Sequence, residues 1–294
     1  MCLCLSHSIM AKTFQPLTNF GSNPGELNAS YLVDDNRTQK LILVLHGCGQ
    51  SAENLARNSG LVNQAKQQGF AVLAIQQQAS NNATTCFNWF SKTDQLKNSG
   101  ETLSIMNMVA KAKVITGSQS VYVIGLSAGG AMASSLLAQY PEEFKAGAVV
   151  AGIPFPCANN LIKAISCMKS GTSLTAQQMA NEIQDKQVKW PDLIVIAGNK
   201  DAVVNPSNAS LMARQWQLLK SLSKTKKVEE QQYSISRWNG VNGQVTLIEI
   251  AGMTHGFPIN GDKNNYEKSA PFILNTSFST VDFLVESWIK LNKS

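Results

Sequence analysis

The chain has 294 residues, of which 44% are hydrophobic and only 15% are charged. This composition supplies enough apolar residues for a large core and excludes an intrinsically disordered chain. The formal net charge of +6 supports no more than a mild preference for anionic surfaces, so we expect no nucleic-acid partner.

The N-terminal segment MCLCLSHSIM lacks the basic start, the full-length apolar stretch and the small-residue cleavage site of a signal peptide. Two origins stay open: the segment is a remnant of a signal peptide, or translation begins at Met10. We expect residues 1–15 to form a poorly ordered extension. Farther along, no apolar run approaches the roughly 18 residues that a membrane-spanning helix needs, so we expect no membrane span.

Six short apolar runs are rich in β-branched residues and lack alternation, which is typical of strands buried on both faces. In chain order they cover residues 41–45, 71–75, 121–124, 146–151, 193–197 and 245–250. Apolar residues spaced three and four apart predict helices at residues 51 or 52 to 68, 101–114, 128–139, 206–222 and 280–291. This alternation predicts a single α/β domain, residues 1–294, with a mostly parallel central sheet and helices on both faces.

Residues 153–189 interrupt the alternation with a stretch rich in Ser, Asn, Gln and Lys, which we interpret as a lid-like insertion. Cys157 and Cys167 lie inside it, and either close a disulfide or stay as two reduced, buried thiols. The following basic cluster, formed by Lys220, Lys224, Lys226 and Lys227, is expected on a solvated helix end. The six cysteines of the chain show no zinc-ligand spacing, so we expect no metal.

The segment VYVIGLSAGGAMASSLLAQY contains the pattern G-x-S-x-G between a strand and a helix. A strand that turns directly into a helix leaves no room for side chains at the flanking positions, so glycines occupy them and Ser127 is forced outward. Ser127 is therefore the candidate nucleophile, at the carboxyl edge of the sheet.

A serine nucleophile needs a base, and the chain has only three histidines. His7 lies on the N-terminal segment, and His46 ends the strand 41–45, where an oxyanion-binding loop would begin; there His46 is a candidate substrate contact. His255 follows the strand 245–250 at the correct edge and is the candidate base.

The base in turn needs a carboxylate. Asp201 follows the strand 193–197 at the same edge, whereas Asp192 precedes that strand and belongs at the opposite end. The resulting order Ser, Asp, His is that of α/β-hydrolases. Two backbone N–H groups should bind the oxyanion: that of Ala128, directly after the serine, and that of Cys48, in the loop His46-Gly47-Cys48-Gly49.

These stretches resemble the polyhydroxybutyrate depolymerase-like esterases, which are related to the feruloyl and acetylxylan esterases of carbohydrate esterase family one. The matching segments are LVLHGCGQSAENL, CFNWF, VYVIGLSAGGAMASSLLAQYPEEF, GNKDAVVNP and GMTHGFP, between about residues 40 and 260. The serine motif is shared by all α/β-hydrolases, whereas HGC together with CxNWF is much more specific.

The resemblance implies an α/β-hydrolase fold with Ser127, Asp201 and His255 as catalytic residues and the Cys48 and Ala128 amides as the oxyanion hole. It also implies the disulfides Cys48–Cys86 and Cys157–Cys167. Trp89 would lie near the ester, the alternative being a tryptophan of the core.

The expected function is hydrolysis of short-chain carboxylic esters through an acyl-enzyme, foremost 3-hydroxyalkanoate esters or oligomers, without a cofactor. A feruloyl or acetyl esterase acting on plant polysaccharide is the alternative, and a non-catalytic relative that binds ligands is the alternative from another class. The expected partner is a small or oligomeric ester. The resemblance and the paired cysteines favour a secreted or periplasmic location over a cytoplasmic one. The oligomeric state stays open.

Overall fold

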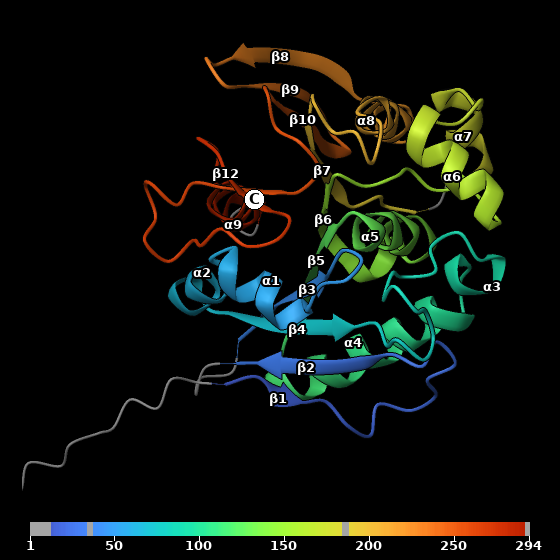
Figure 1. Ribbon diagram of the computed structural model, residues 1–294, viewed down its shortest axis with the longest axis vertical. Helices are drawn as coiled ribbons and strands as arrows, with labels where there is room; N and C mark the ends of the chain where they lie inside the picture. Colours follow the sequence, from blue (N-terminus) through green and yellow to red (C-terminus); the bar gives the residue numbers. More distant parts are fainter. Residues whose placement is uncertain (1–12, 34–37, 184–187, 292–294) are drawn as a thin grey trace, which may run out of the picture.

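The computed structural model describes residues 13–33, 38–183 and 188–291 (Figure 1). The expected N-terminal extension therefore lies almost wholly outside the described residues, and so does His7.

One sheet of ten strands runs through the described part of the chain, in the order β1-β2-β4-β3-β5-β6-β7-β10-β9-β8. The strands are Gln15–Pro16 (β1), Asn28–Leu32 (β2), Lys40–Leu45 (β3), Phe70–Gln76 (β4), Ser120–Leu126 (β5), Phe144–Val150 (β6), Asp192–Gly198 (β7), Ser223–Glu229 (β8), Tyr233–Gly240 (β9) and Gly243–Ile250 (β10). From β4 to β10 all neighbours are parallel, and these are the six predicted buried strands. Strands β1 and β2 at one side and β9 and β8 at the other pair antiparallel. A separate parallel pair joins β11 (Phe257–Ile259) to β12 (Ile273–Asn275).

Helices cover both faces of the large sheet (Figure 1). Helices α1 (Ala52–Asn58), α2 (Leu61–Gln68) and α9 (Thr280–Leu291) pack on one face, and α4 (Gly100–Thr116), α5 (Ala128–Gln139) and α8 (Ser207–Leu219) on the other. Helices α3 (Lys92–Gln95), α6 (Leu161–Ser170) and α7 (Ala176–Ile183) lie on the side of α4, α5 and α8, and a 3-10 turn covers Pro141–Glu143. The predicted α/β architecture with helices on both faces is confirmed.

The helix predicted up to residue 68 is in fact two helices, α1 and α2. Gly60 separates them in the left-handed conformation, with φ of 79°. A Cβ at this position would approach the Tyr266 ring to 2.8 Å. Glycine is therefore required here, both for the positive φ and because there is no room for a side chain. The periodic apolar pattern continues across the break because both helices cover the same face.

The prediction that the basic cluster lies on a solvated helix end is wrong. Lys220 does follow the last residue of α8, but its side chain is fully buried. The residues from Ser223 onward form β8, the outermost strand beside β9, rather than a continuing helix.

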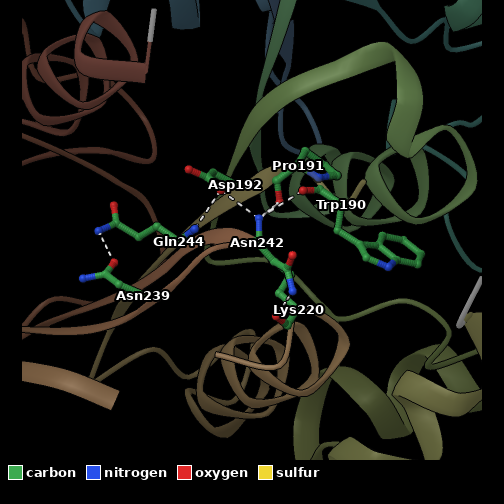
Figure 2. Close-up of polar contacts among 7 residues, drawn as sticks. All are labelled: Trp190, Pro191, Asp192, Lys220, Asn239, Asn242 and Gln244. Atoms are coloured by element: carbon green, nitrogen blue, oxygen red, sulfur yellow. Dashed lines mark hydrogen bonds and ion pairs between the residues drawn. The ribbon is translucent and has the colours of Figure 1, made fainter. Parts of the chain in front are cut away.

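Figure 2 shows what makes the burial of Lys220 possible. Its Nζ donates to the carbonyl oxygens of Trp190 and Pro191 at 3.0 and 2.8 Å and to Asp192 Oδ1 at 2.7 Å. The same oxygen of Asp192 accepts the Gln244 main-chain N–H. Burial lowers the pKa of Lys220, and the Asp192 carboxylate opposes that shift. Asp192 thus lies at the amino end of β7, as predicted, and its carboxylate has a structural role there as the partner of Lys220 and Gln244.

Replacing Lys220 by methionine is expected to lower the free energy of unfolding by about 3 kcal/mol or more, because the change removes the ammonium donor from two carbonyls and from the Asp192 carboxylate. Urea unfolding followed by circular dichroism measures the loss. Lys290→Met is the matched control, since Lys290 forms an exposed ion pair with Glu286 and should change stability by about 0.5 kcal/mol or less. Equal effects of both changes would contradict the interpretation.

Candidate active site

Ser127 stands at a strand-to-helix corner that only small residues permit. It joins β5 to α5 with φ of 56° and ψ of −118°, a strained conformation for a residue with a side chain. A Cβ added at Gly125 would meet the Gly129 carbonyl oxygen at 2.1 Å, and one at Gly129 would meet the Leu45 oxygen at 2.3 Å. Both glycines of the motif are therefore required by close backbone contacts.

Three side chains from separate segments meet in one hydrogen-bonded chain. His255 Nε2 lies 2.8 Å from Ser127 Oγ, and His255 Nδ1 lies 2.7 Å from Asp201 Oδ2. Ser127 follows β5, Asp201 follows β7 and His255 follows β10, so all three lie at the carboxyl edge of the parallel strands. The structure thus brings together the serine, the carboxylate and the imidazole that the sequence singled out.

The Asp201 carboxylate is held rigidly, with a side chain that is only 1% exposed. Its Oδ1 accepts the main-chain N–H groups of Val203 and Val204 at 2.8 and 2.9 Å, which leaves Oδ2 for His255. A carboxylate can only accept here, so the histidine proton lies on Nδ1 and Nε2 is free to accept the serine hydroxyl. This is the protonation arrangement that a general base needs.

The two residues expected to supply the oxyanion donors, Cys48 and Ala128, line the same cavity as Ser127. Ala128 is the first residue of α5, so its N–H has no partner within the helix. In the loop after β3, the N–H of Gly47 donates to Gln50 Oε1 and that of Gly49 to the Thr84 oxygen. Cys48 lies between them and lines the same cavity as Ser127 and Ala128. Its role as a donor stays a prediction.

Both disulfides implied by the family resemblance are present. Cys48 is bonded to Cys86, which ties the loop after β3 to the CFNWF segment. Cys157 is bonded to Cys167, which closes the start of the 153–189 insertion onto helix α6.

A cavity of about 360 Å³ opens over Ser127 and His255. Its walls are mainly apolar, and helix α6 of the insertion supplies Leu161, Ala164, Ile165 and Met168 to them. Trp89 also lines the cavity and is only 7% exposed. It is therefore both a residue of the core and a residue of the cavity that holds Ser127. The insertion therefore builds one wall of the site.

His46 does not reach the cavity, so its prediction as a substrate contact is wrong. Its side chain is fully buried, and Nδ1 bonds the Gly47 carbonyl oxygen at 2.7 Å. Because a carbonyl only accepts, Nδ1 carries the proton, and Nε2 accepts the Gln77 main-chain N–H at 3.1 Å. Burial lowers the pKa of His46, which favours this neutral form. His46 directly follows β3, and its ring turns inward to bond the main chain of Gly47 and Gln77.

A buried carboxyl that the sequence analysis did not single out lies behind the site. Glu101, in the first turn of α4, is 0% exposed. Its Oε1 accepts from Gln77 Nε2, Asn81 Nδ2 and Asn88 Nδ2, and its Oε2 accepts from the Asn88 main-chain N–H, at 2.6 to 3.1 Å. From the sequence, an acidic residue at a helix start is most simply a solvated partner of the helix dipole, so nothing in the local pattern marks it.

The ionisation of Glu101 should make stability depend on pH. Burial raises its pKa from the usual 4.5 to about 8, the Asn88 N–H opposes this, and the nearby carboxylate of Asp94 adds to it. Between these two pH values the folded protein holds a proton that the unfolded chain has released, so stability should fall as pH rises from about 5 to about 8. The slope should reach about 1.4 kcal/mol per pH unit.

The measurement is urea unfolding of the wild type and Glu101→Gln at several pH values in this range. The difference between the two proteins isolates Glu101, because other groups titrate equally in both. A difference that stays constant from pH 5 to 8 would show that Glu101 ionises at an ordinary pH.

The fold and the site geometry together define the class: an α/β-hydrolase with a serine at the elbow between a strand and a helix. Residues 29–229 match the model of the Esterase PHB depolymerase family, and the chain belongs to that family.

Named relatives differ in their substrates. The chain is 32% identical over 268 residues to poly(3-hydroxyalkanoate) depolymerase C of Paucimonas lemoignei, a match that covers 86% of this chain and 64% of the relative. It is 28% identical over 240 residues to feruloyl esterase B of Thermothelomyces thermophilus, covering 76% of this chain and 81% of that enzyme. Acetyl xylan esterase from Aspergillus awamori shares the fold, with a TM-score of 0.76 at 24% identity over 86% of this chain and 97% of that one.

Proposed function

We propose that the protein is a serine esterase that hydrolyses short-chain carboxylic esters, with 3-hydroxyalkanoate esters and their oligomers as its foremost substrates. The observation that carries the proposal is the hydrogen-bonded chain from Asp201 through His255 to Ser127 at the floor of an apolar cavity. Membership of the Esterase PHB depolymerase family supports the same activity.

In the proposed reaction, Ser127 Oγ attacks the ester carbonyl carbon while His255 Nε2 takes the hydroxyl proton. The imidazolium that forms is stabilised by the Asp201 carboxylate. The carbonyl oxygen becomes an oxyanion, which the N–H groups of Cys48 and Ala128 bind. Collapse of this intermediate expels the alcohol, which takes the proton from His255, and leaves the acyl group on Ser127. Water then attacks the acyl-enzyme by the same route and releases the acid.

The cavity favours short acyl groups that carry no charge. Among the described residues that line the cavity, His255 is the only one with a titratable side chain, and the other walls come from residues such as Ile153, Met168 and Val204. A charge close to the scissile ester would lose its hydration there without gaining a partner. We assign to the insertion, through helix α6, the role of a lid-like wall that shapes the acyl site.

A feruloyl or acetyl esterase is the second candidate, because relatives with those names share up to 28% identity with most of this chain. Trp89 and Phe90, which line the cavity with their rings 5.6 Å apart, offer an aromatic surface against which a feruloyl ring could pack.

A hydrolysis panel tests the proposal and separates the candidates. Purified protein would be assayed with p-nitrophenyl acetate and butyrate, trimers of 3-hydroxybutyrate and methyl ferulate. We expect release of 3-hydroxybutyrate from the trimer at a kcat/KM well above that for methyl ferulate. The reverse ranking would select the feruloyl candidate. A protein that cleaves none of these esters would be a binding relative, and the proposal would fall.

We further propose a secreted or periplasmic location, because structural disulfides persist in oxidising compartments. None of the helices in the described residues is long and apolar enough to cross a membrane. Cell fractionation followed by mass spectrometry without reductant would test this. Recovery in the cytoplasm with free thiols would favour the cytoplasmic alternative.

A further inference from the structure

Two walls of the candidate site are anchored to the same buried group. One wall is the loop after β3, which carries Gly47 and Cys48. The other is the segment 86–90, which carries Trp89. Behind both lies the carboxyl of Glu101 on α4, which faces the protein interior and does not line the cavity.

The connection to the first wall runs through Gln77 and His46. Gln77 Nε2 donates to Glu101 at 2.6 Å, and the main-chain N–H of Gln77 donates to His46 Nε2 at 3.1 Å. The other ring nitrogen of His46 holds the Gly47 carbonyl oxygen. A Cβ placed on Gly47 would lie 3.4 Å from the Ser127 Cβ, so this peptide packs directly against the nucleophile. A shift of the Gln77 peptide would therefore move the loop that carries the Cys48 N–H.

The connection to the second wall is direct. Asn88 donates both its main-chain N–H and its side-chain Nδ2 to Glu101, each at 2.9 Å, and Asn88 immediately precedes Trp89. Gln77 Nε2 also donates to the Cys86 carbonyl oxygen, and Cys86 is bonded to Cys48. Glu101 is thus linked through Gln77 to Cys86, whose disulfide with Cys48 joins the two walls.

We infer that Glu101 is a positioning residue of the active site, which sets the oxyanion loop and the Trp89 segment relative to Ser127. The inference rests on the proposed function and adds a residue that touches neither substrate nor the reacting atoms. Its effect should be confined to the transition state, because the Cys48 N–H bonds an oxygen that becomes charged only there.

Glu101→Gln tests the inference with little change in shape. The assays are run at about pH 9, above the pKa of Glu101, where the wild-type carboxyl is ionised and accepts at both oxygens. An amide can place its oxygen toward the three donors at Oε1, but its NH₂ then faces the Asn88 N–H, donor against donor. We expect kcat for p-nitrophenyl butyrate to fall about ten- to a hundredfold while KM stays within about twofold, since an oxyanion donor displaced by a fraction of an ångström no longer matches the transition state. Reaction of Ser127 with a fluorophosphonate should slow by a similar factor.

Thr102→Val is the matched control. Thr102 is the next residue of α4, equally buried, and its hydroxyl bonds only the carbonyl oxygens of Leu96 and Ser99. This variant should lose stability but keep kcat and the labelling rate. Asn88→Ala, which removes one donor and keeps the carboxyl, is the second test if Glu101→Gln does not fold, and should lower kcat with little change in KM.

The outcomes are distinct. A lower melting temperature of Glu101→Gln with unchanged kcat and labelling would make Glu101 a purely structural residue and overturn the inference. Equal losses of kcat in Glu101→Gln and Thr102→Val would do the same. A wild type that neither cleaves esters nor reacts with fluorophosphonate would overturn the proposed function itself, and the inference with it.

Discussion

Ser127→Ala is expected to lower kcat for p-nitrophenyl butyrate by about 10⁶-fold, the loss that removal of the nucleophile causes in other serine hydrolases. The cause is the loss of the attacking oxygen, since Ser127 Oγ lies 2.8 Å from His255 Nε2. The proposed oxyanion donors and the cavity stay in place, so activity should remain about 10³-fold or more above the rate in water. KM should change little.

Two measurements check this expectation. Initial rates give kcat, and a fluorophosphonate probe followed by mass spectrometry of the labelled peptide reports whether residue 127 reacts. Ser135→Ala is the matched control, because Ser135 is a buried serine of helix α5, directly after the Ser127 corner, and its hydroxyl bonds the Ala131 carbonyl oxygen. A Ser127→Ala protein that keeps wild-type activity would remove Ser127 from the mechanism.

Asp201→Asn should lower kcat at pH 7 by about 10⁴-fold although the shape of the site is unchanged. The asparagine has one oxygen instead of two. If that oxygen accepts the N–H groups of Val203 and Val204, its NH₂ faces His255 Nδ1. Nδ1 must then accept, the proton moves to Nε2, and the imidazole can no longer take the proton of Ser127. The asparagine thus enforces the wrong tautomer.

The pH profile of kcat/KM together with the labelling rate measures this effect. Asp262→Asn, the same change at an exposed position, should leave both unchanged. The proposed role of Asp201 requires that the loss appear in kcat and in labelling alike. If Asp201→Asn loses only affinity for substrate, Asp201 is a binding residue rather than the partner of His255.

The parts of the fold that were predictable carry their pattern within a single segment. The six buried strands are continuous apolar runs, and the helices at residues 128–139 and 280–291 have the bounds that their apolar spacing predicts. Ser127 was predictable for the same reason, since the strand, the glycines and the helix adjoin it. Asp201 and His255 followed from the rule that parallel strands end at one edge.

What could not be predicted depends on partners far away in the chain. Lys220 is buried because carbonyls at residues 190 and 191 and a carboxylate at residue 192 surround its ammonium group. Glu101 is buried because donors from residues 77, 81 and 88 converge on it. His46 faces the interior because the Gln77 main-chain N–H donates to its Nε2 there. In each case the local sequence is that of an exposed polar residue. Strands β8 and β9 were missed for a related reason: their polar composition hides strands that lie at the side of the sheet.

The two outermost strands of the large sheet also bear on how the protein behaves when concentrated. Within residues 13–33, 38–183 and 188–291 the sheet is open, so β1 and β8 each have a side onto which a second molecule could add its own strand. At one side β1 is only Gln15–Pro16, and the proline has no N–H to offer. At the other side β8 has the sequence SKTKKVE, and three lysines in seven residues give this strand a positive charge that opposes the addition of a like-charged copy. Both outer strands therefore disfavour aggregation by strand addition. Replacing the lysines of β8 by neutral residues should make such addition easier.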